Sequence, residues 1–299
     1  MIHDPSPRRH HHFVTPEFKI AWYAWGNPTA PKLFFAHGFL DFALSFDPVA
    51  RLLAETHYVV ALDHRGHGDS DRVGAGGYYH FPDYVRDLAS LIEAVVPADT
   101  EETFTLIGHS MGASIAVYLA GAMPERVHSL ILLDGLGPAH VGPDDGPRFM
   151  RRWLSDLRLQ ALRDDPAMVD LETVAQRLAR TAPFASPVRL LELARLAAVR
   201  ADDGLWRWRF DPLHRTRAPT PFDVQRFIAF LAAIACPTTI IRGERSPMWE
   251  EDADLRVAAL RDVTVETLAG TAHNLHHEVP LELAARLAVL LNEPRPKGG

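Results

Sequence analysis

Short apolar runs alternate with longer amphipathic segments along most of this 299-residue chain. Runs of strand length occupy residues 18–25, 33–36, 57–62, 104–107, 127–133, 238–242 and 264–268. Apolar positions at helical spacing occupy residues 46–54, 82–96, 113–122, 222–233, 252–260 and 281–291. Strands and helices that alternate through short connections are typical of a mostly parallel sheet with helices on both faces. We therefore expect an α/β fold.

The N-terminal part departs from this alternation. The first two apolar runs are separated by a turn at Gly26-Asn27-Pro28, which predicts a β-hairpin leading into a buried strand. Residues 1–12 are polar and contain His10-His11-His12 without acidic or cysteine ligands nearby. These residues are therefore predicted to be a mobile terminus and not a metal site.

A different composition begins after Asp134. Residues 137–221 are rich in arginine, leucine and alanine, with helix-like stretches at 148–163, 171–179 and 188–199 and no clear strand pattern. This segment is predicted to be a helical cap inserted into a core domain made of residues 1–136 and 222–299.

Composition narrows the classes of partner. The net charge is −7 and no lysine or arginine cluster forms a basic stripe, so we expect no nucleic-acid partner. No run of about 18 apolar residues is present and the N-terminus lacks a hydrophobic signal core, which predicts no membrane span and a cytoplasmic location. The single cysteine, Cys236, starts an apolar strand and is expected to be buried. The oligomeric state has no signature in the sequence.

The stretch from residue 104 to residue 112 carries the first sign of chemistry. An apolar run leads into Gly108-His109-Ser110-Met111-Gly112 and then directly into a helical pattern. Glycines on both sides of the serine let strand and helix approach closely, and the serine hydroxyl projects above the sheet. The start of the helix would stabilise negative charge at the same place.

Other polar residues follow the predicted strands directly. His37, Asp63 and Asp134 stand at strand ends, as Ser110 does. Because ligands of parallel sheets bind at the carboxyl ends of the strands, we expect these side chains at one edge.

The order of four motifs resembles the α/β-hydrolase superfamily with a helical cap, from about Phe13 to Leu291. These motifs are His37-Gly38, Asp63-x-Arg65-Gly66-x-Gly68-x-Ser70, the Gly108–Gly112 turn, and Gly270-Thr271-Ala272-His273 followed by Glu278 and Pro280. The resemblance implies an α/β-hydrolase fold, a serine nucleophile served by histidine and a carboxylate, and no cofactor or metal.

Ser110 is the predicted nucleophile and His273 the predicted base, because the chain order serine, acid, histidine is kept. In most of the family the acid follows the penultimate strand, where this chain has Ser246. A known variation places the acid one strand earlier, so Asp134 is the preferred acid, with Ser246 as a hydrogen-bonding auxiliary. Glu244 and the run Glu250-Glu251-Asp252 stay open as alternatives.

The resemblance also assigns binding groups. The backbone N–H groups of Phe39 and Met111 are the expected oxyanion hole, while His109 is expected to pack beneath the turn. The side chains expected to contact substrate are those of the loop after residue 36 and the cap aromatics, namely His37, Gly38, Leu40, Trp153, Trp206 and Trp208.

These features together predict a serine hydrolase acting on a small or medium carboxylic ester. The same residues also serve lactone, amide, thioester or carbon–carbon bond hydrolysis and perhydrolysis. A receptor that binds a small molecule without hydrolysing it is the alternative from another class.

Overall fold

An eight-stranded sheet forms the centre of the molecule in the computed structural model, which describes residues 9–14, 18–163, 165–249 and 251–292. The strand order is β1-β2-β4-β3-β5-β6-β9-β10. The strands are β1 (Arg9–Val14), β2 (Lys19–Trp25), β3 (Lys32–Ala36), β4 (Tyr58–Leu62), β5 (Phe104–His109), β6 (Val127–Leu133), β9 (Thr238–Gly243) and β10 (Val263–Leu268). The pairs from β4 to β10 are parallel, and β1 and β2 are antiparallel additions at one edge. The expected α/β-hydrolase fold is confirmed.

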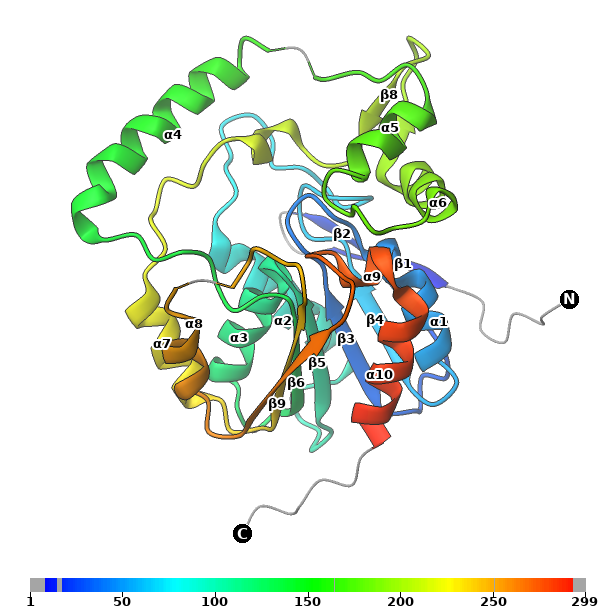
Figure 1. Cartoon of the computed structure of the whole chain (residues 1–299), viewed down its shortest axis with the longest axis vertical. Coiled ribbons are helices and arrows are strands. Elements are labelled where there is room, and N and C mark those ends of the chain that lie inside the picture. Colours follow the sequence, from blue (N-terminus) through cyan, green and yellow to red (C-terminus); the bar gives the residue numbers. More distant parts are fainter. Residues whose placement is uncertain (1–8, 15–17, 164, 250, 293–299) are drawn as a thin grey trace, which may run out of the picture.

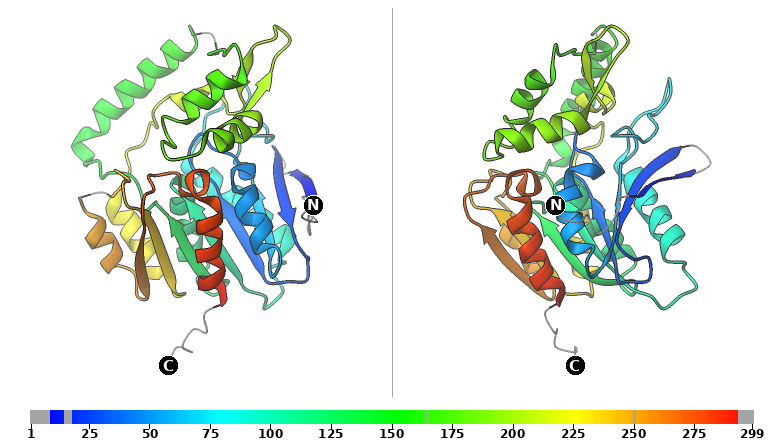
Figure 2. Two further views of the ribbon diagram at one scale, coloured as in Figure 1. Left: turned by 45° about the vertical axis from the view of Figure 1, so that its right-hand side comes forward. Right: turned by 90° about the vertical axis from the view of Figure 1, so that its right-hand side faces the viewer.

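Helices cover both faces of the sheet (Figures 1 and 2). On one face lie α1 (Asp47–Leu53) and α10 (Pro280–Asn292); on the other lie α2 (Phe81–Val95), α3 (Met111–Ala122), α7 (Val224–Ala233) and α8 (Ala253–Ala258). Side chains of successive strand residues point to opposite faces of the sheet. Phe34, for example, packs in the core on one face and Phe35 in the core on the other. Central strands buried on both faces therefore form continuous apolar runs in the sequence.

The N-terminal predictions need two corrections. Residues 9–12 belong to β1, which pairs with β2, so they are not a mobile terminus; residues 1–8 lie outside the described chain. The predicted hairpin is wrong as well, because β2 pairs with β1 and β4 while β3 pairs with β4 and β5. Lys32–Ala36 thus reaches the middle of the sheet.

The segment between β6 and α7 lies above the carboxyl ends of the strands (Figure 1). It contains α4 (Gly146–Gln160), α5 (Leu171–Leu178) and α6 (Pro187–Ala197), close to the predicted helices. It also contains β7 (Ala198–Arg200) and β8 (Trp206–Trp208), an antiparallel pair that the sequence pattern did not predict. Strands of three residues are too short to show alternation. The residue limits of core and cap stay a prediction.

Several smaller expectations can be compared with the structure. Cys236 is buried, as predicted. Over the described ranges, none of the helices has the length and apolar character that crossing a membrane requires. The cytoplasmic location and the absence of a nucleic-acid partner stay predictions.

Candidate active site

Ser110 stands at a sharp turn between β5 and α3. Its φ angle of 52° lies in the left-handed region that side-chain-bearing residues seldom adopt. A Cβ at Gly112 would lie 2.1 Å from the Ala36 carbonyl oxygen, and one at Gly108 would lie 2.4 Å from the Gly112 carbonyl oxygen. Only glycine fits at positions 108 and 112. Without side chains there, β5, α3 and the end of β3 can pack closely around the strained turn that projects the Ser110 hydroxyl.

His273 joins Ser110 to Asp134 through two hydrogen bonds. Its Nε2 lies 2.9 Å from Ser110 Oγ, and its Nδ1 lies 2.6 Å from Asp134 Oδ2. A carboxylate only accepts, so Nδ1–H donates to Asp134 and Nε2 is free to accept the Ser110 proton. Asp134 is buried and the His273 side chain is partly open to solvent. The imidazole is thus held in the tautomer that can act as a base.

The Asp134 carboxylate is held at the end of β6. Its Oδ1 accepts a hydrogen bond of 2.9 Å from Gly243 N–H, and its Oδ2 accepts another from Ser246 Oγ–H. Asp134 itself has a φ of 46°, so its backbone is strained as well, and the next residue, Gly135, packs closely against the Ser110 backbone. Both Asp134 carboxylate oxygens have protein donors, which keeps the carboxylate in one orientation.

The other acid candidates lie elsewhere. Glu244 Oε2 accepts a hydrogen bond of 2.8 Å from Gly270 N–H and is solvent-exposed. Asp252 forms an ion pair with Arg256, and Glu251 is exposed. Glu250 lies outside the described residues. Of the candidates that the structure describes, only Asp134 contacts His273.

The loop after β3 approaches the Ser110 turn. Within the described chain, the N–H groups of Phe39 and Met111 donate to no other protein group, and both residues line the cavity beside Ser110. Two unpaired N–H groups beside the serine are the arrangement that an oxyanion hole needs. A Cβ at Gly38 would lie 2.7 Å from His109 Nδ1, so glycine lets the loop come this close.

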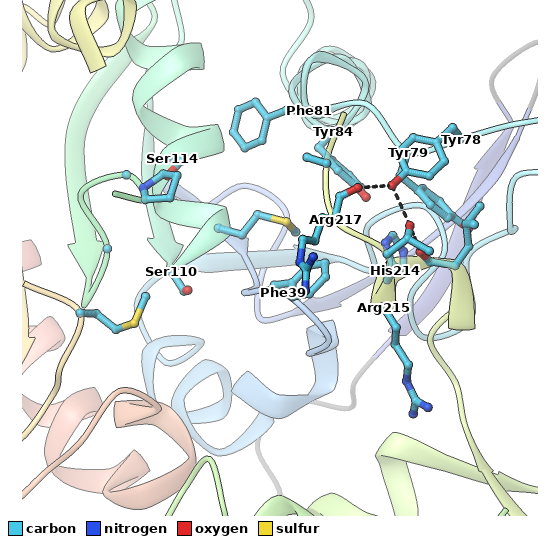
Figure 3. A pocket seen from close by; sticks show the side chains of 18 of the residues that line it. Phe39, Tyr78, Tyr79, Phe81, Tyr84, Ser110, Ser114, His214, Arg215 and Arg217 are labelled. Carbon is cyan, nitrogen blue, oxygen red and sulfur yellow. Dashed lines mark hydrogen bonds between the residues drawn. The ribbon is translucent and has the colours of Figure 1, made fainter. Parts of the chain in front are cut away.

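A cavity of about 630 Å³ opens next to Ser110 (Figure 3). Its lining is mainly aromatic and aliphatic, and the tyrosines lie on the opposite side of the view from Ser110. The aromatic lining residues are Phe39, Tyr78, Tyr79, Phe81, Tyr84 and Phe149. Apolar walls with a few polar groups are typical of small-molecule sites.

Most of the side chains predicted to contact substrate lie elsewhere. Trp206 and Trp208 pack with α5 and α6 in the core of the cap, and Trp153 lies against Tyr78 outside the cavity lining. Trp206 and Trp208 therefore stabilise the cap. None of the three tryptophans lines this cavity, and their contact with substrate stays a prediction.

The neighbours of Phe39 in the loop after β3 contact other protein groups and not the cavity. His37 is buried, its Nδ1–H donates to Gly38 O and its Nε2 accepts from His64 N–H. Leu40 packs against the cap core. Neither residue lines the cavity, and nor does Gly38, so the predicted substrate contacts of all three are not supported.

Two groups of cavity residues were missed by sequence reasoning. One is the aromatic loop from Tyr78 to Phe81, whose cluster of rings after the Gly76-Gly77 pair was a usable signal. The other is Arg215 and Arg217 of the cap. Arg217 Nε lies 3.8 Å from Asp156 Oδ2, a loose ion pair that leaves its side chain more than half exposed. Nothing in the local pattern separates these arginines from the others of the cap.

One group of described residues has the composition of a metal site: Asp41, His276 and His277, with ligand atoms within 4.8 Å of one another. His276 Nε2 lies 2.9 Å from Asp41 Oδ2 and His277 Nε2 lies 3.2 Å from Asp41 Oδ1. These are direct hydrogen bonds, whereas a zinc ion would need deprotonated nitrogens at roughly 2 Å from a shared centre. The two Nε2–H donors and the Asp41 oxygens pair directly without an ion, whereas the Nδ1 atoms of both histidines are buried without a partner among the described residues.

Comparison with known proteins assigns most of the chain to one family. The family model described as "Alpha/beta hydrolase family" matches residues 33–286. The chain is 30% identical over 272 residues to a 3-hydroxybutyrate-oligomer hydrolase of Cupriavidus necator, covering 88% of this chain and 85% of that protein. It is 39% identical over 167 residues to serine hydrolase-like protein 2 of Homo sapiens, covering 54% of this chain and 51% of the relative, so it spans about half of that relative's length. A solved structure of a hypothetical protein from Pseudomonas aeruginosa PAO1 has a TM-score of 0.83 and 28% identity, covering 94% of this chain and 98% of that one.

Proposed function

The chain belongs to the alpha/beta hydrolase family and is a hydrolase, and from this premise we propose that it cleaves a small or medium carboxylic ester through an acyl-enzyme on Ser110. The observation that carries the proposal is the unbroken hydrogen-bond chain from Ser110 Oγ through His273 to Asp134. A neutral imidazole that accepts from a serine hydroxyl and donates to a buried carboxylate is what activation of a serine requires.

The geometry supports the following course for the acylation half of the proposed reaction. Ser110 Oγ attacks the ester carbonyl carbon while its proton passes to His273 Nε2. The carbonyl oxygen becomes an oxyanion that accepts hydrogen bonds from the N–H groups of Phe39 and Met111, and Asp134 stabilises the imidazolium. The carbon–oxygen bond to the leaving alcohol then breaks, and His273 returns the proton to that alcohol.

Deacylation repeats these steps with water. His273 Nε2 takes a proton from a water molecule, whose oxygen attacks the acyl carbon of the Ser110 ester. The second tetrahedral intermediate uses the same N–H donors. When it collapses, Ser110 leaves with the proton from His273, and the carboxylic acid product and the free enzyme result.

The cavity supports an ester with an apolar part. Its aromatic walls favour an aliphatic or aromatic group of moderate size, and Arg215 and Arg217 add positive charge to one wall. The Cupriavidus necator relative is named for 3-hydroxybutyrate oligomers, which are short esters ending in a carboxylate. A hydroxyacid oligoester therefore belongs in the substrate panel beside neutral acyl esters of increasing length.

Lactone, amide, thioester or carbon–carbon bond hydrolysis and perhydrolysis stay alternatives, because the same three side chains serve each of them. A receptor without hydrolytic activity is the poorer alternative. It would not need a serine hydroxyl within 2.9 Å of an imidazole that a buried carboxylate orients.

The test is covalent labelling combined with turnover. A fluorophosphonate should modify wild-type protein at Ser110, and Ser110→Ala should lose both the label and the hydrolysis of p-nitrophenyl acyl esters. Ser155→Ala, at an exposed position on α4, is the matched control and should keep both. If the Ser110→Ala variant still hydrolyses the esters at the wild-type rate, the proposed mechanism is wrong.

A further inference from the structure

A second buried carboxylate lies near the candidate active site, outside the Ser110–His273–Asp134 chain. Asp41 accepts a hydrogen bond on each oxygen, from Nε2–H of His276 at 2.9 Å and from Nε2–H of His277 at 3.2 Å. All three side chains are buried, and His276 has no exposed surface. Both histidines lie in the short helix α9 (Leu275–Glu278).

The two ends of this contact belong to the two loops that matter most for the proposed reaction. Asp41 follows Phe39 by two residues, and the residue between them, Leu40, has a φ of 60°. His276 and His277 follow His273 by three and four residues. The contact therefore joins the loop that carries one candidate oxyanion donor to the loop that carries the candidate base.

Further contacts show that the Asp41 site is built into the fold. The single Ser45 Oγ–H is shared between Asp41 Oδ2 at 3.0 Å and the Phe42 carbonyl oxygen at 2.7 Å. Arg189 from α6 of the cap donates to the Ser45 carbonyl oxygen at 2.7 Å. The His276 ring stacks on Phe46 with centroids 4.2 Å apart, which fixes the plane of the imidazole. The carboxylate is thus held from the core and, through Ser45, from the cap.

The charge state agrees with this hydrogen bonding. Burial alone would raise the pKa of Asp41, yet the two neighbouring histidines, His277 first, hold that pKa well below its ordinary value. Burial lowers the pKa of His276 to about 3, so its ring is neutral near pH 7 and donates through Nε2–H. An ionised carboxylate that faces imidazole N–H donors forms strong, well-directed hydrogen bonds.

We propose that Asp41 is a positioning residue which, through His276 and His277, holds the Phe39 N–H and the His273 imidazole at a fixed separation. The inference rests on the proposed function, because it concerns where the oxyanion donor and the base stand relative to the same substrate carbonyl. Those two groups come from loops more than 230 residues apart in sequence, and Asp41 is bonded across that separation. Displacement of a catalytic group by about 1 Å can cost roughly 100-fold in rate, so a direct bond between the loops has a clear benefit.

The test uses five variants of the full chain, of which three change the contact singly. Asp41→Asn replaces one acceptor oxygen by an NH2 group, so that one histidine Nε2–H loses its acceptor and faces a second donor. His276→Leu removes the Nε2–H donor. Each should lower kcat roughly 10- to 100-fold with little change in KM. The substrate site stays formed, but the Phe39 N–H and the His273 imidazole are no longer held at a fixed separation. His276→Gln places an amide N–H close to the position of Nε2–H and should retain most of the wild-type kcat.

Asp47→Asn is the matched control. Asp47 lies six residues further along, and its carboxylate accepts hydrogen bonds from Trp25 and Arg51, away from both loops. This variant should change stability without changing kcat. A cycle of Asp41→Asn, His276→Leu and the double variant should be strongly non-additive, because both substitutions remove the same contact.

Failure of the inference is distinguishable from failure of the proposed function. If wild-type protein is labelled at Ser110 but Asp41→Asn keeps a kcat within twofold, only the positioning role is wrong. The positioning role is also wrong if His276→Gln is as impaired as His276→Leu, or if Asp47→Asn loses kcat equally. Stoichiometric zinc in the purified wild-type protein, lost in Asp41→Asn, would replace the hydrogen-bonded arrangement by a metal site.

Discussion

Asp134 Oδ2 lies 2.6 Å from His273 Nδ1, although the two residues are 139 positions apart in the chain. The contact forms because β6 ends at Leu133 and the loop after β10 returns over the same edge of the parallel sheet. The same oxygen also accepts from Ser246, in the loop after β9. Three loops thus meet at one carboxylate oxygen.

Asp134→Asn should lower kcat by about 10⁴-fold, because the amide no longer fixes the histidine tautomer or stabilises the imidazolium. Steady-state kinetics on a p-nitrophenyl acyl ester checks this. Glu244→Gln is the comparison and should stay close to wild type, since a glutamine can still accept from Gly270 N–H. Near-normal turnover in Asp134→Asn together with a collapsed Glu244→Gln would transfer the acid role to Glu244.

A carboxylate at position 246 should partly rescue the Asp134→Asn variant. Ser246 Oγ bonds to the Asp134 oxygen that also faces His273, so an aspartate there can reach the imidazole. The kcat of the double variant Asp134→Asn/Ser246→Asp should be at least about tenfold higher than that of Asp134→Asn. Asp134→Asn/Ser246→Ala is the control and should recover nothing. No gain with aspartate would show that the carboxylate must enter from the β6 side.

Phe149→Ala should weaken binding of esters with long acyl chains. Phe149 lies on α4 and lines the cavity, and the lost apolar contact corresponds to roughly 1–2 kcal/mol, or about tenfold in KM. The kcat and the KM for an acetyl ester should stay unchanged, because a short chain does not reach the cap. Leu154→Ala, on the same helix but exposed and away from the cavity, is the control. Equal effects on short and long esters would contradict the assigned position of the acyl group.

The folded state should lose stability in acid. Burial lowers the pKa of a set of buried histidines, to about 4 for His214 and to about 3 for His276, so the unfolded chain binds more protons below about pH 6.5. The set with lowered values also includes His37, His64, His67 and His109. Stability is therefore fully present above the unfolded pKa of 6.5 and falls as the pH drops toward the folded values. Three carboxyl groups act in the opposite direction, because burial raises the pKa of Asp63 to about 7 and also raises the pKa of Asp87 and Glu278. They are fewer than the histidines, and the lowered pKa of Asp41 adds to the loss of stability in acid.

The measurement is the melting temperature from about pH 7.5 to about pH 4.5, a window that spans the unfolded histidine pKa. His214→Phe keeps an aromatic ring against His67 and Tyr79 but removes a group that takes up a proton only on unfolding. Its melting temperature should fall less steeply with acid than that of wild type. His128→Phe, at an exposed position on β6, should leave the slope unchanged. Identical slopes for wild type and His214→Phe would contradict the assigned role of burial.

The fold was predictable because its central elements carry local signals. The predicted strand 127–133 and the observed β6 have the same bounds, since its buried run from Leu130 to Leu133 is continuously apolar and Asp134 marks its end. β1 was missed because three of its six residues are consecutive histidines, which show no apolar alternation. Its stability comes from pairing with β2 and from rings such as His11 stacked on Trp22, contacts that no local pattern reveals.

The hairpin error has a similar origin. A turn signal between two apolar runs indicates that the chain reverses, but not which strand each run will pair with. Here β4 inserts between β2 and β3, a choice made by the packing of the whole sheet. The tryptophans of β8 were likewise recognisable as apolar side chains, whereas their direction depended on the fold of the cap.

The sequence by itself determined the α/β fold, the positions of Ser110 and Asp134 at strand ends and that of His273 in the loop after the last strand, because turn chemistry and apolar periodicity are local properties. Tertiary structure decided which carboxylate contacts His273 and which aromatic side chains line the cavity. It also decided that Asp41 forms hydrogen bonds with His276 and His277. Each of these depends on distances of a few ångströms between loops far apart in the chain. Those distances are set only when the sheet and the cap are packed.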